Sequence, residues 1–279
     1  MPPEDGFKNT LNVSEAGDIE TEVIDLAAAA EQPTRSGRKR PPRRFDQTQL
    51  HATHHGKYVH RDYLAHAMRW SWVGRHLDRD DRVLDVACGQ EIPLMHVLSG
   101  SKSLLPSLYV GVDLNSVPFG GSPKWARILE KFNFVDDYEK LAEKLPESEG
   151  GFNKIVNFEV IEHMSPPDGE KLLLGLKHWL KEDGKIYLST PVFDGKAAVN
   201  HVHEYEIPEL QALIEKVGLK VQQRFGTFMN AQAIKAQALG QDWLTYQRLL
   251  DYHGHDTLST FLAPLYPDAS RNNLWVLTK

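Results

Sequence analysis

The feature that most constrains the fold is a series of short apolar runs separated by segments with helical periodicity. The clearest runs are residues 82–87, 108–114, 154–160 and 185–190. They are apolar throughout rather than alternating, which is typical of strands in a parallel sheet covered on both faces. Strands that alternate with helices predict an open, doubly wound α/β domain.

Two further runs, residues 220–228 and 273–279, are predicted to be the last two strands. Helices are predicted over residues 61–77, 93–98, 165–184 and 208–218, with a helical insertion over 229–258. Pro93 suits the first turn of a helix, because its missing N–H would be unpaired there. Ser165 and Asp168 have the spacing of a capping box, and Gly184 is expected to end that helix.

Charge is distributed unevenly along the chain, whose formal net charge is −6. Residues 1–31 carry about −7 and residues 32–44 carry +6, so residues 45–279 carry −5. Block charge and low apolar content predict a disordered, acidic-then-basic tail over residues 1–48. The folded domain is then expected over residues 49–279, with residues 49–80 as an N-terminal helical lid.

The amino-acid composition also indicates in which cellular compartment the protein is expected. Cys88 is the one cysteine, so an internal disulfide is excluded and a reducing compartment is expected. The sequence has no apolar run near the roughly 18 residues that a membrane helix needs, and its N-terminus is acidic where a secretory signal is basic. We therefore expect a cytoplasmic protein without a membrane partner; the sequence does not predict its oligomeric state.

Residues 83–91, VLDVACGQE, place an acid and a turn of small residues after the first predicted strand. In a doubly wound sheet, ligands bind beyond the carboxyl ends of the strands. A dinucleotide site would need G-x-G-x-x-G in this loop, which offers only Gly89, and the chain has no P-loop motif. The turn fits a ligand that carries an adenosine and a carboxylate but no phosphate.

Four segments in order, VLDVACG, YVGVDL, FNKIVNFEVIEHM and LKEDGKIYLSTPVF, resemble the class I S-adenosylmethionine-dependent methyltransferases. The resemblance covers roughly residues 82–225. It implies a Rossmann-like, doubly wound, seven-stranded sheet, with a third strand at residues 132–135. It also implies that the methyl group of S-adenosylmethionine is moved to an acceptor.

The resemblance also implies roles for individual residues. Asp85, Ala87, Cys88 and Gly89 would line the methionine part of the cofactor, and Glu91, where the family has a second glycine, would turn to its ammonium or to a ribose hydroxyl. Asp113 would accept hydrogen bonds from the ribose, with Leu114 beside it. Asp136 or Asp137 would meet the adenine amino group, and Glu159 would face the transferable methyl.

The stretch E-V-I-E-H at residues 159–163 resembles two groups of methyltransferases with different acceptors. One group resembles the ubiquinone-biosynthesis type and methylates small molecules. The other methylates the terminal ribose of small RNAs and implies a divalent metal held by Glu159, Glu162 and His163 with His201 or His203. We favour the first, without a metal and with His163 as general base, because histidine is the side chain that most often takes up a proton in catalysis.

The acceptor is therefore expected to be a small molecule, in keeping with the acidic folded part. A nucleic-acid methyltransferase that binds through residues 35–44 is the first alternative, and a non-catalytic binding or assembly module is the second. Tyr58, Arg61 and Tyr63 are the candidates for a lid over the cofactor. The H-x-H within residues 251–256 is expected to be a polar turn.

Overall fold

The computed structural model describes residues 61–90, 92–100, 105–117, 123–230, 233 and 243–279. All of these belong to one unit of the chain, Pro42–Lys279. The predicted tail, Tyr58, Glu91 and the basic residues 35–44 lie outside the described residues, as does part of the predicted insertion. Arg61 and Tyr63 begin a helix, and only their backbone is described.

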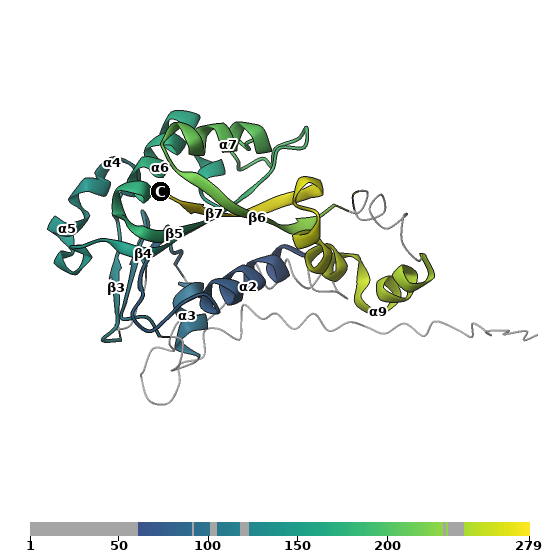
Figure 1. The fold of residues 1–279 in the computed structure, drawn as a ribbon, viewed down its shortest axis with the longest axis horizontal. Coiled ribbons are helices and arrows are strands. Elements are labelled where there is room, and N and C mark those ends of the chain that lie inside the picture. Colours follow the sequence, from purple (N-terminus) through teal and green to yellow (C-terminus); the bar gives the residue numbers. More distant parts are fainter. Residues whose placement is uncertain (1–60, 91, 101–104, 118–122, 231–232, 234–242) are drawn as a thin grey trace, which may run out of the picture. The chain divides into compact units, whose positions relative to one another are not determined.

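Seven strands form one mixed sheet in the order β3-β2-β1-β4-β5-β7-β6 (Figure 1). They are β1 (Arg82–Val86), β2 (Leu108–Val112), β3 (Ala126–Leu129), β4 (Phe152–Phe158), β5 (Leu180–Pro191), β6 (Lys220–Met229) and β7 (Ser270–Thr278). β7 runs antiparallel to β5 and β6, and the other neighbours pair in parallel. The strand order reverses between β1 and β4, which is where such sheets bind ligands.

Helices cover both faces of the sheet. They are α2 (Arg61–Gly74), α3 (Pro93–Ser99), α4 (Phe134–Asp137), α5 (Leu141–Lys144), α6 (Pro166–Trp179), α7 (Ile207–Lys216) and α9 (Trp243–Leu262), the last kinked at Gly254. Short 3₁₀ turns lie at Tyr138–Lys140, Pro146–Ser148, Ile161–His163 (η5), Ala263–Leu265 (η6) and Pro267–Ala269 (η7). No helix of the described residues is long and apolar enough to span a membrane.

The apolar strands explain why there are two separate cores. On one face α4, α6 and α7 pack on the sheet, and on the other face α2 and α3 do so (Figure 1). Successive strand residues point to opposite faces, so Leu84 and Val86 enter the first core while Val83 enters the second. The prediction that both faces of the sheet are covered is confirmed.

Two predicted elements are wrong in detail. Residues 132–135 are not the third strand; that strand is β3, and the Asn133 side chain instead caps α4 by accepting from the N–H groups of Val135 and Asp136. The helix that begins after Ser165 ends at Trp179 rather than at Gly184, which lies inside β5. The predicted polar turn at 251–256 lies within α9, around the kink at Gly254.

Candidate active site

Strained backbone gathers at the carboxyl edge of the sheet. Ala87 (φ 58°), Ile92 (φ 45°), Lys131 (φ 55°) and Glu159 (φ 57°) are the non-glycine residues of the described chain with positive φ. All four follow β1, β3 or β4. L-residues in this region cost about 1–3 kcal/mol each, and such residues cluster at active sites. The strain marks the edge between β1 and β4 as the candidate site.

Asp113 joins the ends of β1 and β2. Its Oδ2 accepts from the Gly89 N–H at 2.9 Å, and its Oδ1 accepts from the Asn115 N–H at 2.8 Å. Asp113 is buried, whereas its neighbour Leu114 is 64% exposed. Gly89 has φ +73°, a conformation that glycine adopts without the steric cost of a Cβ. The arrangement pairs a fixed carboxylate with an exposed apolar side chain at the tip of β2.

Asp85 is buried below this edge. The Tyr109 hydroxyl donates to its Oδ2 at 2.6 Å. Burial raises the pKa of Asp85 to about 7; the Tyr109 hydrogen bond opposes this shift, and nearby Asp113 adds to it. Cys88 is also buried and packs toward β2, where a Cβ on Gly111 would lie 3.0 Å from its Sγ. The Cys88 side chain is therefore part of the core beneath the loop.

Glu159, directly after β4, is the centre of a hydrogen-bond network. Its carboxylate accepts from Ser189 Oγ at 2.7 Å and from Asn272 Nδ2 at 2.8 and 3.0 Å, and Arg69 Nη1 lies 3.6 Å away. Burial alone would raise the pKa of Glu159. Arg69 and His66, together with the Asn272 and Ser189 hydrogen bonds, outweigh burial and hold that pKa below its usual value. Glu159 is thus a partly buried, ionised carboxylate.

Arg69, which sequence reasoning did not select, supplies the positive charge. It is only 3% exposed, and its Nη1 also donates to Thr227 Oγ1 at 3.1 Å and to Asn272 Oδ1 at 3.0 Å. Its position four residues from both Ala65 and Val73 puts a charged residue on the buried face of α2. An arginine within the apolar face of an amphipathic helix was the sequence feature that could have identified it.

Glu162, His163 and His201 come together beside Glu159. Their ligand atoms all lie within 4.8 Å of one another, so the structure unites three of the four predicted metal ligands. Glu159 is not in that group, and His203 instead contacts Glu209 at 2.7 Å. His163 Nδ1 lies 3.0 Å from the Asn200 carbonyl, and His201 Nδ1 lies 2.6 Å from Glu204 Oε1.

Nδ1 of each imidazole therefore has a polar partner, and Nε2 of His163 lies 4.0 Å from Glu162 Oε1. An imidazole nitrogen that carries no proton can take one up or bind a divalent metal. Glu162 is buried, and its Oε2 accepts from Thr190 Oγ1 at 3.0 Å. Burial raises the pKa of Glu162 to about 8, and the nearby Glu159 charge adds to the rise. The group can act in acid–base chemistry, and its metal binding stays a prediction.

Asp136 and Asp137 lie on α4 rather than at the end of a strand. Asp136 pairs with Lys171 at 3.3 Å and Asp137 with Lys140 at 2.6 Å, on the surface. The first residues after β3 are Glu130 and Lys131, and the Phe132 N–H donates to the Asp113 carbonyl at 2.9 Å. The predicted contact with adenine stays a prediction.

Comparison with known proteins gives the family. Residues 52–243, more than half of the chain, match the family model described as "Methyltransferase domain". The chain belongs to this family. It is a class I S-adenosylmethionine-dependent methyltransferase, and S-adenosylmethionine is its cofactor. No protein of curated function matches the sequence.

Two solved structures are similar to the chain at low sequence identity. A SAM-dependent methyltransferase from Archaeoglobus fulgidus has a TM-score of 0.50 and 12% identity, and the match covers 78% of this chain and 94% of that one. A TehB-like SAM-dependent methyltransferase from Corynebacterium glutamicum has a TM-score of 0.49 and 17% identity, with 84% and 95% covered. The similarity to the Archaeoglobus fulgidus structure supports the fold, and at 12% identity it supports nothing beyond the fold. The predicted Rossmann-like sheet of seven strands is confirmed.

Proposed function

We propose that this methyltransferase holds its cofactor along the ends of β1, β2 and β4 and transfers the methyl group to a small molecule. Asp113 suits the ribose, because each carboxylate oxygen has two lone pairs and each makes one hydrogen bond in the structure. The exposed Leu114 offers apolar contact to a base. Asp85, Ala87 and the bend at Cys88 and Gly89 form the floor for the amino-acid end.

Bound S-adenosylmethionine supplies a methyl group on a positively charged sulfur, which leaves as a neutral thioether when the electron pair of the acceptor takes the methyl. The ionised Glu159 lies at the tip of β4, where a negative charge favours the sulfonium. His163 takes the proton that the acceptor loses. Its Nδ1 lies 3.0 Å from the Asn200 carbonyl and donates to it, which leaves the lone pair on Nε2.

The observation that carries this assignment is the position of His163. It directly follows Glu162 in η5, four residues from Glu159, and its side chain is 42% exposed, so it can reach an acceptor. The net charge of −5 over residues 45–279 supports a small molecule rather than a nucleic acid. The nucleic-acid alternative depends on residues 35–44, outside the described residues. As the single cysteine is buried and free, we also propose a cytoplasmic enzyme.

The test is calorimetry with S-adenosylmethionine, S-adenosylhomocysteine and NAD, followed by mass spectrometry of a cell extract incubated with methyl-labelled S-adenosylmethionine. The first two should bind and NAD should not. A labelled product should appear among small molecules, and label only in nucleic acid would contradict the proposal.

His163→Gln should lower the rate of labelling by about 10²–10⁴-fold, the usual contribution of a general base. Its affinity for S-adenosylmethionine should not change. His178→Gln, on the exposed surface of α6, is the matched control and should keep the full rate. A His163→Gln variant with the full rate would remove the general base from the mechanism.

A further inference from the structure

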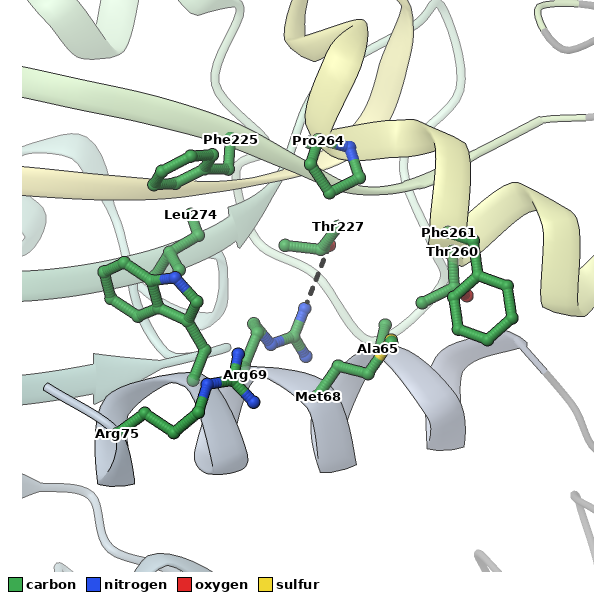
Figure 2. A pocket seen from close by; sticks show the side chains of 12 residues that line it. Ala65, Met68, Arg69, Arg75, Phe225, Thr227, Thr260, Phe261, Pro264 and Leu274 are labelled. Carbon is green, nitrogen blue, oxygen red and sulfur yellow. Dashed lines mark hydrogen bonds between the residues drawn. The ribbon is translucent and has the colours of Figure 1, made fainter.

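A cavity lies between α2, β6 and the end of α9. Its volume is about 220 Å³. Figure 2 shows Met68, Arg69 and Arg75 on α2, with Phe225 and Leu274 opposite them. Phe261 and Pro264 border the other end of the cavity (Figure 2). Sites for drug-sized ligands measure about 300–1,000 Å³, so this cavity suits a group of one or two rings rather than a large molecule.

The rim of the cavity exposes apolar surface to solvent. Met68 is 41% exposed and Phe261 is 48% exposed. The Trp72 ring packs edge-on against Phe225 with ring centroids 5.6 Å apart, which gives the cavity an aromatic wall. Exposed apolar and aromatic side chains around a hollow are typical of a binding site for an apolar ligand.

The charges at the cavity are all of one sign. Two of its twelve lining residues are arginines, and none is an aspartate or glutamate. Arg69 is already committed to Glu159, Thr227 and Asn272. Arg75 is exposed, and in the described part of the chain its side chain makes one hydrogen bond, to Ser71 Oγ at 3.2 Å, and no ion pair. An anion at the Arg75 end would therefore find a partner.

The cavity also adjoins the candidate active site. Arg69 lines the cavity and lies 3.6 Å from Glu159, so the same side chain borders the cavity and the carboxylate at the tip of β4. Thr227, which also lines the cavity, and Asn272 belong to the same hydrogen-bond network. A ligand in the cavity would touch the residues that hold Glu159.

From this geometry we infer that the cavity is the subsite for the aromatic part of the methyl acceptor, and that Arg75 pairs with an anionic substituent on it. The inference rests on the proposed function and narrows its acceptor to an anionic aromatic molecule. The apolar walls of the cavity bind the rings, and Arg75 at its rim selects the charge.

Binding is tested by calorimetry on the full chain with naphthalene-1-sulfonate and its uncharged analogue naphthalene-1-sulfonamide. The sulfonate should bind more tightly. Arg75→Ala should weaken it about 2- to 5-fold, as expected for an exposed ion pair, and should leave the sulfonamide unchanged. Arg79→Ala is the matched control, since Arg79 is exposed and does not line the cavity.

Met68→Trp should fill the rim and weaken both probes, whereas Leu249→Trp, at a similarly exposed position of α9, should weaken neither. Equal affinity for both probes, or full affinity in Arg75→Ala, would overturn the inference. So would an affinity that falls as the protein concentration rises, because a second copy of the chain would then cover the cavity.

The link to the acceptor is tested by adding the probes to the labelling reaction in cell extract. The sulfonate should suppress labelling in the wild type, and Arg75→Ala should require more of it. Binding without suppression would overturn the acceptor role. Failure of S-adenosylmethionine to bind would instead contradict the proposed function and leave the probe affinities as a separate result.

Discussion

Glu159 and Glu162 lie three residues apart after β4, yet the surroundings of the two carboxyl groups differ. Glu159 bonds Ser189 and Glu162 bonds Thr190; successive residues of β5 point to opposite faces of the sheet. On the first face Arg69 compensates the buried charge, and the pKa of Glu159 falls. On the second no arginine or lysine of the described chain pairs with Glu162, and its pKa rises to about 8. The two carboxyl groups differ in burial as well as in charged neighbours, because the Glu159 side chain is 21% exposed and lies beside Arg69, whereas the Glu162 side chain is 1% exposed.

The largest effect on this difference between Glu159 and Glu162 is expected from the substitution Arg69→Ala. Removing Arg69 leaves the partly buried Glu159 charge uncompensated and should cost up to about 3–5 kcal/mol of the free energy of unfolding, the range for a fully buried ion pair. Urea denaturation measures the loss, and Arg79→Ala should lose nothing. The double variant Arg69→Met with Glu159→Gln, which removes both charges, should recover most of the stability. A loss below about 1 kcal/mol in Arg69→Ala would mean that water solvates Glu159.

The substitution Glu162→Gln tests the protonation of the other carboxyl group, through its effect on how stability depends on pH. The raised pKa means that the folded state holds a proton that the unfolded state releases near pH 4.5, so wild-type stability falls as the pH rises from about 4.5 to about 8. Each pKa unit corresponds to about 1.4 kcal/mol. In the Glu162→Gln variant the free energy of unfolding should not fall in this way, so the variant should be more stable than the wild type at pH 8–9. Asp85, with its pKa near 7, keeps a smaller decline in both proteins.

Denaturation curves at pH 5, 7 and 9 measure that effect. A wild type and a Glu162→Gln variant with parallel pH profiles would show that Glu162 ionises normally. Glu159→Gln provides the opposite sign, because a lowered pKa contributes stability that is present above pH 4.5 and lost in acid.

Smaller losses of stability are expected from removing the neighbouring hydroxyl groups of Ser189 and Thr190 in β5. Ser189→Ala removes a donor to the ionised Glu159 and should cost about 1.5–3 kcal/mol, the range for hydrogen bonds to charged groups. Thr190→Val removes the bond to the largely neutral Glu162 at pH 7 and should cost about 0.5–1.5 kcal/mol. Both are read from urea denaturation at pH 7. Equal losses would argue that the two carboxyl groups carry the same charge.

The smallest effect is expected from metal removal. At pH 7 most Glu162 is protonated, so with His163 and His201 it offers a divalent ion little negative charge. Dialysis against EDTA should leave the rate of labelling unchanged. Loss of labelling that Mn²⁺ or Mg²⁺ restores would assign the three residues to a metal site and contradict His163 as a free base.

Much of the candidate site follows from local sequence. Asp85 and Asp113 end predicted strands, and Glu159 follows another. Parallel strands bring their carboxyl ends to one edge, so these acids were expected to meet. Arg69 and Asn272 could not be placed in the same way. Arg69 and Asn272 both contact Glu159, from which they lie 90 and 113 residues away in the sequence, and no local pattern specifies contacts over such distances. The third strand was misplaced because 132–135 is apolar enough for a strand, whereas the Asn133 cap makes it a helix.

The sequence by itself determined the fold class, six of the seven strands and the acidic residues at their ends, because apolar periodicity and turn residues act over a few neighbouring positions. Only the tertiary structure decided that β7 inserts antiparallel between β5 and β6 and thereby brings Asn272 against Glu159. It also decided that Arg69 lies beside one glutamate while no arginine or lysine of the described residues forms an ion pair with the other. Charge compensation depends on distances across the sheet, and those exist only once the chain has packed.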